Sequence, residues 1–157
     1  MNNELYNVLL HLHSVGRWIV LVLLLIAIFN SAVAGNRPYI KSDNRTGLFV
    51  TIFADIMLLL GIALWFLSPR WGYQTIQARG MADVMSDSVA RFYVIEHLTG
   101  MLIAIILLHI GKAQGKKAIG DRAKHRRTVI YYTIALLIIL LSIPWPFRSI
   151  AAGSGWF

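Results

Sequence analysis

Four long apolar stretches dominate the chain and limit the folds that are open to it. They cover residues 18–34, 47–67, 92–110 and 128–147, and each approaches the ~20 residues that a helix needs to cross about 30 Å of hydrocarbon. With 57% hydrophobic residues among 157, the composition is too apolar for a soluble domain of this length. Because lipid cannot hydrogen-bond an open backbone, the stretches predict transmembrane helices.

We therefore expect an all-α fold, an integral membrane four-helix bundle with up-down-up-down order. The expected spans are about 14–35, 47–68, 90–111 and 128–147, and the short connections make residues 1–157 a single transmembrane domain. Residues 1–16 contain Glu4 and no Lys or Arg, so the charged first region of a signal peptide is missing. The first helix is expected to be retained.

The basic residues predict the orientation, because Lys and Arg accumulate in short cytoplasmic loops. Ten of the 15 lie in or beside the first and third connections: Arg37, Lys41, Arg45, Lys112, Lys116, Lys117, Arg122, Lys124, Arg126 and Arg127. We expect these connections to be cytoplasmic and both termini to lie on the other side, the periplasm of a bacterial inner membrane. The net charge of +8 is then a topology signal and a contact with anionic lipid heads, with no nucleic-acid partner.

Ionisable side chains at membrane depth are costly and usually mark a functional site. His13 lies near the outer end of the first span, and His97 lies about two turns into the third. First and third helices of such a bundle face each other, so the two imidazoles are expected at similar depth. Together they could bind a haem b iron as axial ligands. The chain has no Cys, which removes thiolate metal sites, iron–sulfur clusters and c-type haem.

Helical spacing favours His13 over His11 as the ligand, because residues two apart point in different directions. The stripe through His13 continues with small and polar residues that suit a core: Arg17, Val20, Leu24, Ala27 and Ser31. The stripe through His11 is bulky and suits lipid: Trp18, Val22, Leu25 and Phe29. A copper or zinc site at His11 and His13 is the weaker alternative, because a third ligand is not evident.

Arg17 lies one turn after His13 on the same face. It is a candidate partner for a haem propionate, and the alternative is an arginine that reaches the headgroups. Glu96 adjoins His97 and could relay protons, pair with Arg17 or Arg91, or stay protonated. Gly100 leaves room beside His97, either for a macrocycle or for a close helix.

A second polar set lies nearer the cytoplasmic side and contains Asp55, Thr51 and His109. It suits either a second cofactor or quinone site, or a buried hydrogen-bonded pair. His109 is about 18 Å along the helix from His97 and cannot share its iron. No second His lies at membrane depth on that side to pair with His109, so we expect one haem. His125 lies in the basic segment and is expected to be solvated.

Three segments resemble a known family: HLHSVGRW at 11–18, RFYVIEH at 91–97 and IPWPFR at 143–148. They resemble small four-helix membrane proteins of Bacteroidetes that are labelled cytochrome b-like, and the likeness covers nearly the whole chain. The resemblance implies haem and electron transfer. Relatives often carry His near the place of Asp55, so its absence here is a departure that argues against a second haem.

The leading hypothesis is therefore a b-type cytochrome that passes electrons near the outer face, between the quinone pool and a redox partner. One alternative is a haem-free structural or accessory subunit of a larger membrane complex. Another is a proton or ion path through Asp55, Glu96 and His97. The sequence has no GxSxG elbow, HExxH zinc helix or phosphate-binding glycine loop, and it leaves open whether the protein is an enzyme.

Overall fold

The computed structural model describes residues 3–151, which are mostly helical and contain no β-strand in that range. Its long helices are α1 (Asn3–Ala32), α2 (Lys41–Leu67), α6 (His97–Gln114) and α7 (Asp121–Ser142). Shorter elements are α3 (Tyr73–Arg79), α4 (Met81–Ser86), α5 (Ser88–Arg91), the π-helix η1 (Phe92–Glu96) and the 3₁₀ turn η2 (Ser149–Ala151). The all-α class is confirmed.

Four helical segments within these residues are long and apolar enough to cross a membrane: Glu4–Ala32, Lys41–Leu67, Ser88–Gln114 and Asp121–Ser142. The first begins well before the expected residue 14, because residues 3–15 contain no Gly or Pro to interrupt it. The last ends at Ser142 and not at 147, because Pro144 and Pro146 cannot donate to a continuing helix.

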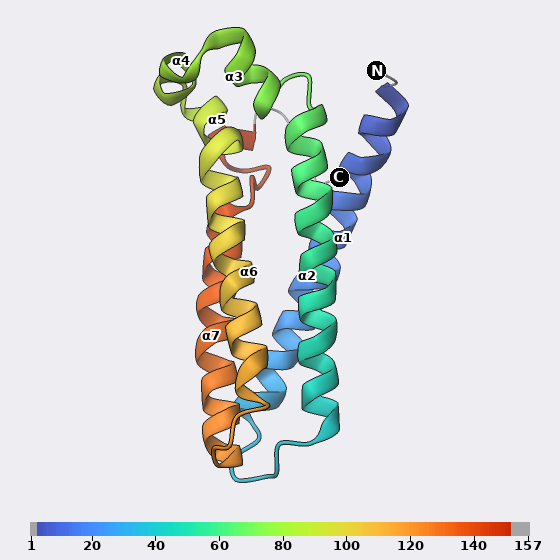
Figure 1. The fold of residues 1–157 in the computed structure, drawn as a ribbon, viewed down its shortest axis with the longest axis vertical. Helices are drawn as coiled ribbons and strands as arrows, with labels where there is room; N and C mark the ends of the chain where they lie inside the picture. Colours follow the sequence, from blue (N-terminus) through green and yellow to red (C-terminus); the bar gives the residue numbers. More distant parts are fainter. Residues whose placement is uncertain (1–2, 152–157) are drawn as a thin grey trace.

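The long helices lie side by side (Figure 1). The main contacts join α1 to α2, α2 to α6, α6 to α7 and α7 to α1, which puts α1 and α6 on a diagonal. The connections 33–40 and 115–120 lie together at one end, which we call the basic end. At the other end α3, α4 and α5 form a helical cap, so we call it the cap end. Two of these short helices, α3 and α4, lie between residues 68 and 87.

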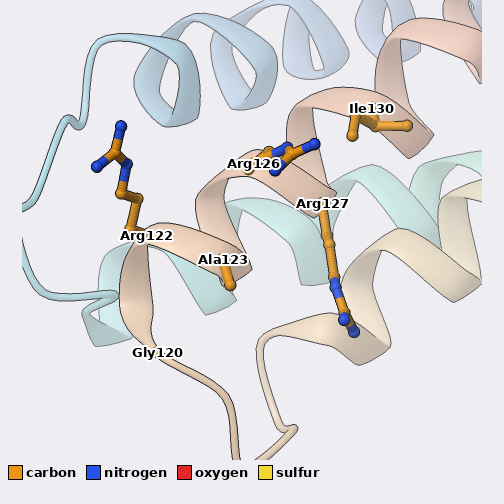
Figure 2. Close-up of a pocket in the computed structure, with 6 residues that line it drawn as sticks. All are labelled: Gly120, Arg122, Ala123, Arg126, Arg127 and Ile130. Carbon is orange, nitrogen blue, oxygen red and sulfur yellow. The ribbon is translucent and has the colours of Figure 1, made fainter.

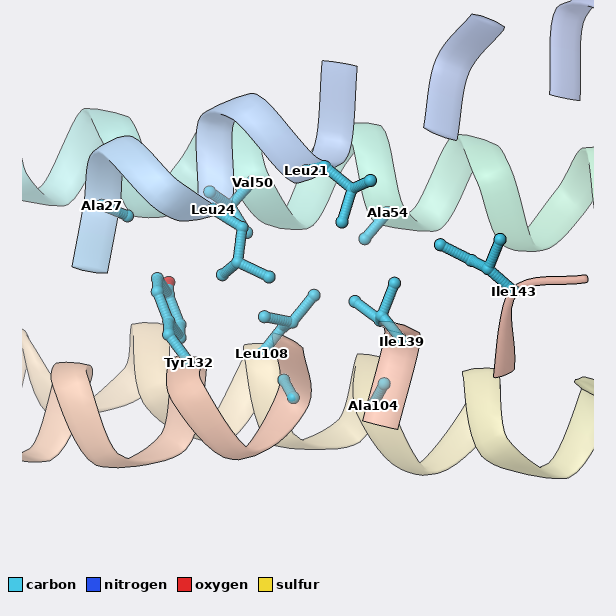
Figure 3. Close-up of a cluster of buried hydrophobic side chains, with 11 residues drawn as sticks. Leu21, Leu24, Ala27, Val50, Ala54, Ala104, Leu108, Tyr132, Ile139 and Ile143 are labelled. Carbon is cyan, nitrogen blue, oxygen red and sulfur yellow. The ribbon is translucent and has the colours of Figure 1, made fainter. Parts of the chain in front are cut away.

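One buried cluster joins the four long helices inside the bundle (Figure 3). The buried cluster takes residues from all four long helices: Leu21, Leu24, Ala27, Val50, Ala54, Ala104, Leu108, Tyr132, Ala135, Ile139 and Ile143. Toward the cap end, described burial stops at Val20 on α1 and at Ala54 on α2. The fully buried side chains of α1 and α2 thus lie in their basic-end halves, and the inward side chains of their cap-end halves are partly exposed.

Candidate functional site

His13 and His97 meet across the bundle diagonal, toward the cap end. Their ring centres are 6.3 Å apart and their planes are inclined by 68°. Two imidazoles that bind one metal ion from opposite sides hold each nitrogen about 2 Å from the metal and each ring centre roughly 1 Å further, so the centres lie about 6 Å apart. The observed separation is therefore suited to a shared metal ion.

A backbone carbonyl orients His97. Its Nδ1–H donates to the oxygen of Ser142 at 2.6 Å, which leaves Nε2 as the nitrogen with a lone pair for a ligand. In a continuing helix the Ser142 oxygen would accept from the N–H of residue 146. That residue is Pro146, which has no N–H. The proline thus leaves an acceptor at the end of α7, and the imidazole uses it.

Side chains of residues 143–148 donate hydrogen bonds to other backbone C=O groups at the end of α7. The Leu140 oxygen, whose helical donor would come from Pro144, accepts from Trp145 Nε1 at 2.8 Å. Arg148 Nη1 donates to the oxygens of Leu141 at 2.6 Å and Ile143 at 3.1 Å. The sequence showed only that this segment ends a helix; that it also anchors the His97 imidazole depends on a tertiary contact.

A π-helical turn, η1, leads directly into His97. The His97 N–H donates to the Phe92 oxygen, five residues back, so the turn is wider than an α-helical one and rotates the residues that follow it. The Val94 oxygen in this turn accepts from Trp65 Nε1 of α2 at 3.0 Å. Such turns occur often at functional sites, and no residue pattern in 92–96 predicted it.

Two glycines let neighbouring helices pack close to the imidazole pair. A Cβ on Gly61 of α2 would lie 3.2 Å from His13 Cε1, and one on Gly100 would collide with Ser142 Oγ. Of the two expectations for Gly100, the structure shows the close helix: α7 packs directly against it. This close approach is what brings the Ser142 carbonyl within reach of His97.

His13 contributes a buried polar atom that the protein does not satisfy. Its Nδ1 has no hydrogen-bond partner among the described residues. An unsatisfied buried polar atom costs about 1–3 kcal/mol, and a bound group that takes up such an atom recovers that cost. The paired rings, the oriented His97 and this open nitrogen would suit a metal ion or a haem iron as a ligand pair.

Arg17 lies beside the pair. Its guanidinium is 5.4 Å from the Trp18 ring centre and 6.0 Å from that of Trp145, and its charge acts on both imidazoles. Glu96 does not join this group. It pairs instead with Arg91, at 2.7 Å between Oε1 and Nε, which is one of the partners expected for it.

The burial of side chains along α1 matches the two stripes described from the sequence. Val20, Leu24, Ala27 and Ser31, on the His13 stripe, are all buried. His11 is exposed, and three residues of its stripe, Val22, Leu25 and Phe29, are more than half exposed. The structure thus places His13, and not His11, among the inward side chains.

Asp55 and His109 form a contact of 2.8 Å between Oδ1 and Nε2. The expectation of a buried pair is wrong, because their side chains are 48% and 47% exposed on the outside of α2 and α6. Thr51 does not take part, since its hydroxyl bonds to the Leu48 oxygen of its own helix at 3.0 Å. Glu96 and His97 lie near the other end of the span that contains His109, so they are not part of this pair.

His125 was expected to be solvated, and this is wrong, because only 2% of it is exposed. Residues 121–127 are not loop but the first turns of α7, and they carry His125 on the same inward face as Tyr132. Its ring packs on Tyr39 at 4.9 Å between centres, and its Nδ1 lies 3.5 Å from Ser31 Oγ. Burial raises the pKa of Tyr39 in the connection.

No group of three or more His, Asp or Glu side chains that could hold a metal ion occurs in residues 3–151. A shallow depression of about 840 Å³ at the basic end is lined by Gly120, Arg122, Ala123, Arg126, Arg127 and Ile130. Its three arginines point in different directions (Figure 2), and Arg127 donates to Gln114 at 3.1 Å. Charges that diverge in this way suit a basic surface near lipid heads better than one bound phosphate.

Comparisons with protein-family models, with curated proteins and with solved structures gave no match.

Proposed function

We propose that this protein is a membrane cytochrome that binds one haem b between His13 and His97 and transfers electrons near the outer face of the membrane. The observation that carries the proposal is the imidazole pair, 6.3 Å between ring centres, with His97 Nδ1 held by Ser142. Two neutral imidazoles from facing helices are a known way to hold haem iron, and the hydrogen bond raises the basicity of the ligand. The resemblance of segments 11–18, 91–97 and 143–148 to cytochrome b-like proteins supports the same reading.

Each neighbouring residue has a distinct role in this proposal. His13 and His97 would hold the haem iron, and Arg17 would neutralise a propionate beside Trp18 and Trp145. The missing side chain of Gly61 lets α2 lie close to His13. Bound haem supplies reversible one-electron transfer, and the protein sets its potential through the ligands, their hydrogen bonds and burial.

The proposal includes an up-down-up-down bundle inserted in a bacterial inner membrane, with both termini in the periplasm. The basic residues at 37–45 and 112–127 support this orientation, since they gather at one end and the cap has fewer. The haem then lies in the periplasmic half. A membrane quinone on one side and a periplasmic or membrane-bound redox protein on the other are the proposed partners.

A reduced-minus-oxidised absorption spectrum of the purified full-length protein tests the proposal. We expect the bands of a six-coordinate b-type haem in the wild type and in His11→Ala, the matched control on the exposed face. His13→Ala and His97→Ala should lose these bands while keeping their helical circular dichroism. A folded wild type that takes up no haem during expression or titration would overturn the proposal and favour the haem-free accessory subunit.

A further inference from the structure

The Asp55–His109 pair lies within two membrane-length helices, and its own hydrogen bond does not explain why ionisable groups occur there. Asp55 lies in the middle of the α2 span, and His109 lies in the α6 span on the neighbouring helix. Both side chains are about half exposed. In a bilayer they would face hydrocarbon, where ionisable groups are costly unless they serve a function.

The pair retains polar atoms for a further contact. Its own contact joins His109 Nε2 to Asp55 Oδ1, and the hydrogen bonds of the described residues do not use His109 Nδ1 or Asp55 Oδ2. When the pair is an imidazolium and a carboxylate, both ring nitrogens of His109 donate, Nε2–H to Asp55 Oδ1 and Nδ1–H to a ligand carbonyl, and Asp55 Oδ2 can accept from a hydroxyl. The pair thus offers one donor and one acceptor to a molecule that reaches it from the lipid.

The residues around the pair are bulky. Ile52 and Leu59, one turn to either side of Asp55, are 41% and 67% exposed, and Ile106, one turn before His109, is 57% exposed. Membrane helices that pack closely on each other use small residues such as Gly, Ala, Ser and Thr. This face is therefore poorly suited to a second helix and well suited to the alkyl tail of a lipid-soluble ligand.

We infer that Asp55 and His109 form a binding site for the headgroup of a membrane quinone or quinol. Such a molecule diffuses in the bilayer, carries carbonyl or hydroxyl oxygens on a flat ring, and has an apolar tail that would lie along Ile106 and Leu59. His109 donates to a quinone carbonyl, and Asp55 accepts from a quinol hydroxyl. The site is distinct from the His13–His97 pair, and its occupation does not require haem.

Quinone titration of the full-length protein in lipid nanodiscs tests this inference. The probes are decylubiquinone and 2-methyl-3-decyl-1,4-naphthoquinone, and the readouts are the unfolding midpoint against empty-lipid baselines and the infrared carbonyl band of the quinone. We expect the wild type to show a saturable rise of the midpoint with one of the probes and a downshifted, hydrogen-bonded carbonyl band. Leu137→Ile, at an exposed apolar position on α7 outside the proposed site, is the matched control and should behave as the wild type.

His109→Leu should weaken binding at least tenfold and remove the downshifted band. The double variant Asp55→Leu/His109→Leu leaves no unpaired charge in lipid, so it remains informative if the single variant folds poorly. His13→Ala should lose haem and keep quinone binding, which separates this inference from the proposed function. It is overturned if the wild type shows no saturable response, if the double variant binds within twofold of the wild type, or if the wild-type particle holds two copies and the double variant one.

Discussion

The hydrogen bond between His97 and Ser142 depends on two residues that never touch the imidazole. Pro146 removes the N–H that would otherwise occupy the Ser142 carbonyl, and Gly100 lets α7 come close enough for that carbonyl to reach Nδ1. Hydrogen bonds of this kind fix which nitrogen binds a metal, and their loss typically costs about 10–100-fold in metal affinity. A single glycine thus influences a ligand that lies one turn away from it.

Gly100→Ala should therefore separate α6 from α7 and weaken the site. The new methyl would collide with Ser142 Oγ, and overpacking of this kind costs about 1–3 kcal/mol. We expect a lower unfolding midpoint in detergent and about a tenfold or greater loss in haem affinity by titration. Gly120→Ala is the control, because a methyl there meets nothing within 4 Å. Equal midpoints and haem affinities for the two variants would contradict the role of Gly100.

Among the elements, the π-helix η1 connects the cap to the candidate ligand. Its Val94 oxygen accepts from Trp65 Nε1, so the end of α2 is joined to the turn that aims His97. Just before it, Asp87 caps α5 by accepting from the N–H groups of Val89 at 3.0 Å and Ala90 at 3.1 Å. The direction of His97 thus depends on a chain of local contacts through the cap.

Trp65→Phe should loosen this connection while it keeps an aromatic ring in place. The variant removes the indole donor of one hydrogen bond, which is worth about 0.5–1.5 kcal/mol, and it leaves the Val94 oxygen without that partner. We expect a lower unfolding midpoint and faster hydrogen exchange in residues 92–97. Trp71→Phe, which keeps the stacked contact with Tyr93, should change exchange there much less. Unchanged exchange in Trp65→Phe would show that the bond does not hold η1.

The cap should lose stability in acid because of Asp87. The backbone N–H of Ala90, with Arg79 at 2.9 Å, lowers the pKa of this carboxyl. A lowered pKa in the folded state means that the carboxylate contributes stability above its unfolded value of about 3.9, and that this contribution is lost as pH falls through the lower folded value. We expect Asp87→Asn to be less stable than wild type at pH 7, with the difference shrinking toward pH 3 in unfolding measurements. A difference that stays constant over this range would contradict it.

The parts of the structure that the sequence predicted are the ones that depend on neighbours along the chain. Long apolar runs predict the four long helices, and the periodicity of α1 predicts that Leu24 is buried and Phe29 exposed. The His97–Ser142 bond joins residues 45 apart, and η1 has no local pattern. The exposure of Asp55 and the burial of His125 depend on how whole helices rotate against one another. Neither rotation can be read from one stretch of sequence.

For the molecule as a whole, orientation is the property most open to direct measurement. The chain has no Cys, so a single introduced one is the sole thiol. We expect Gln77→Cys, in the cap helix α3, to react with a membrane-impermeant maleimide in intact spheroplasts. Lys117→Cys, in the connection at the basic end, should react only after lysis. The reverse pattern would place the proposed haem on the cytoplasmic side.

The uneven packing of the bundle has a consequence for how the protein matures. Leu24, Val50, Leu108 and Tyr132 belong to one buried cluster that joins all four long helices, whereas side chains of α1 around His13 stay partly exposed. The helices can therefore hold together through this cluster before any cofactor enters beside His13. If the protein binds the proposed haem, we expect the polypeptide to leave the insertion machinery as an assembled apoprotein and to receive the haem last, through the half whose side chains are partly exposed.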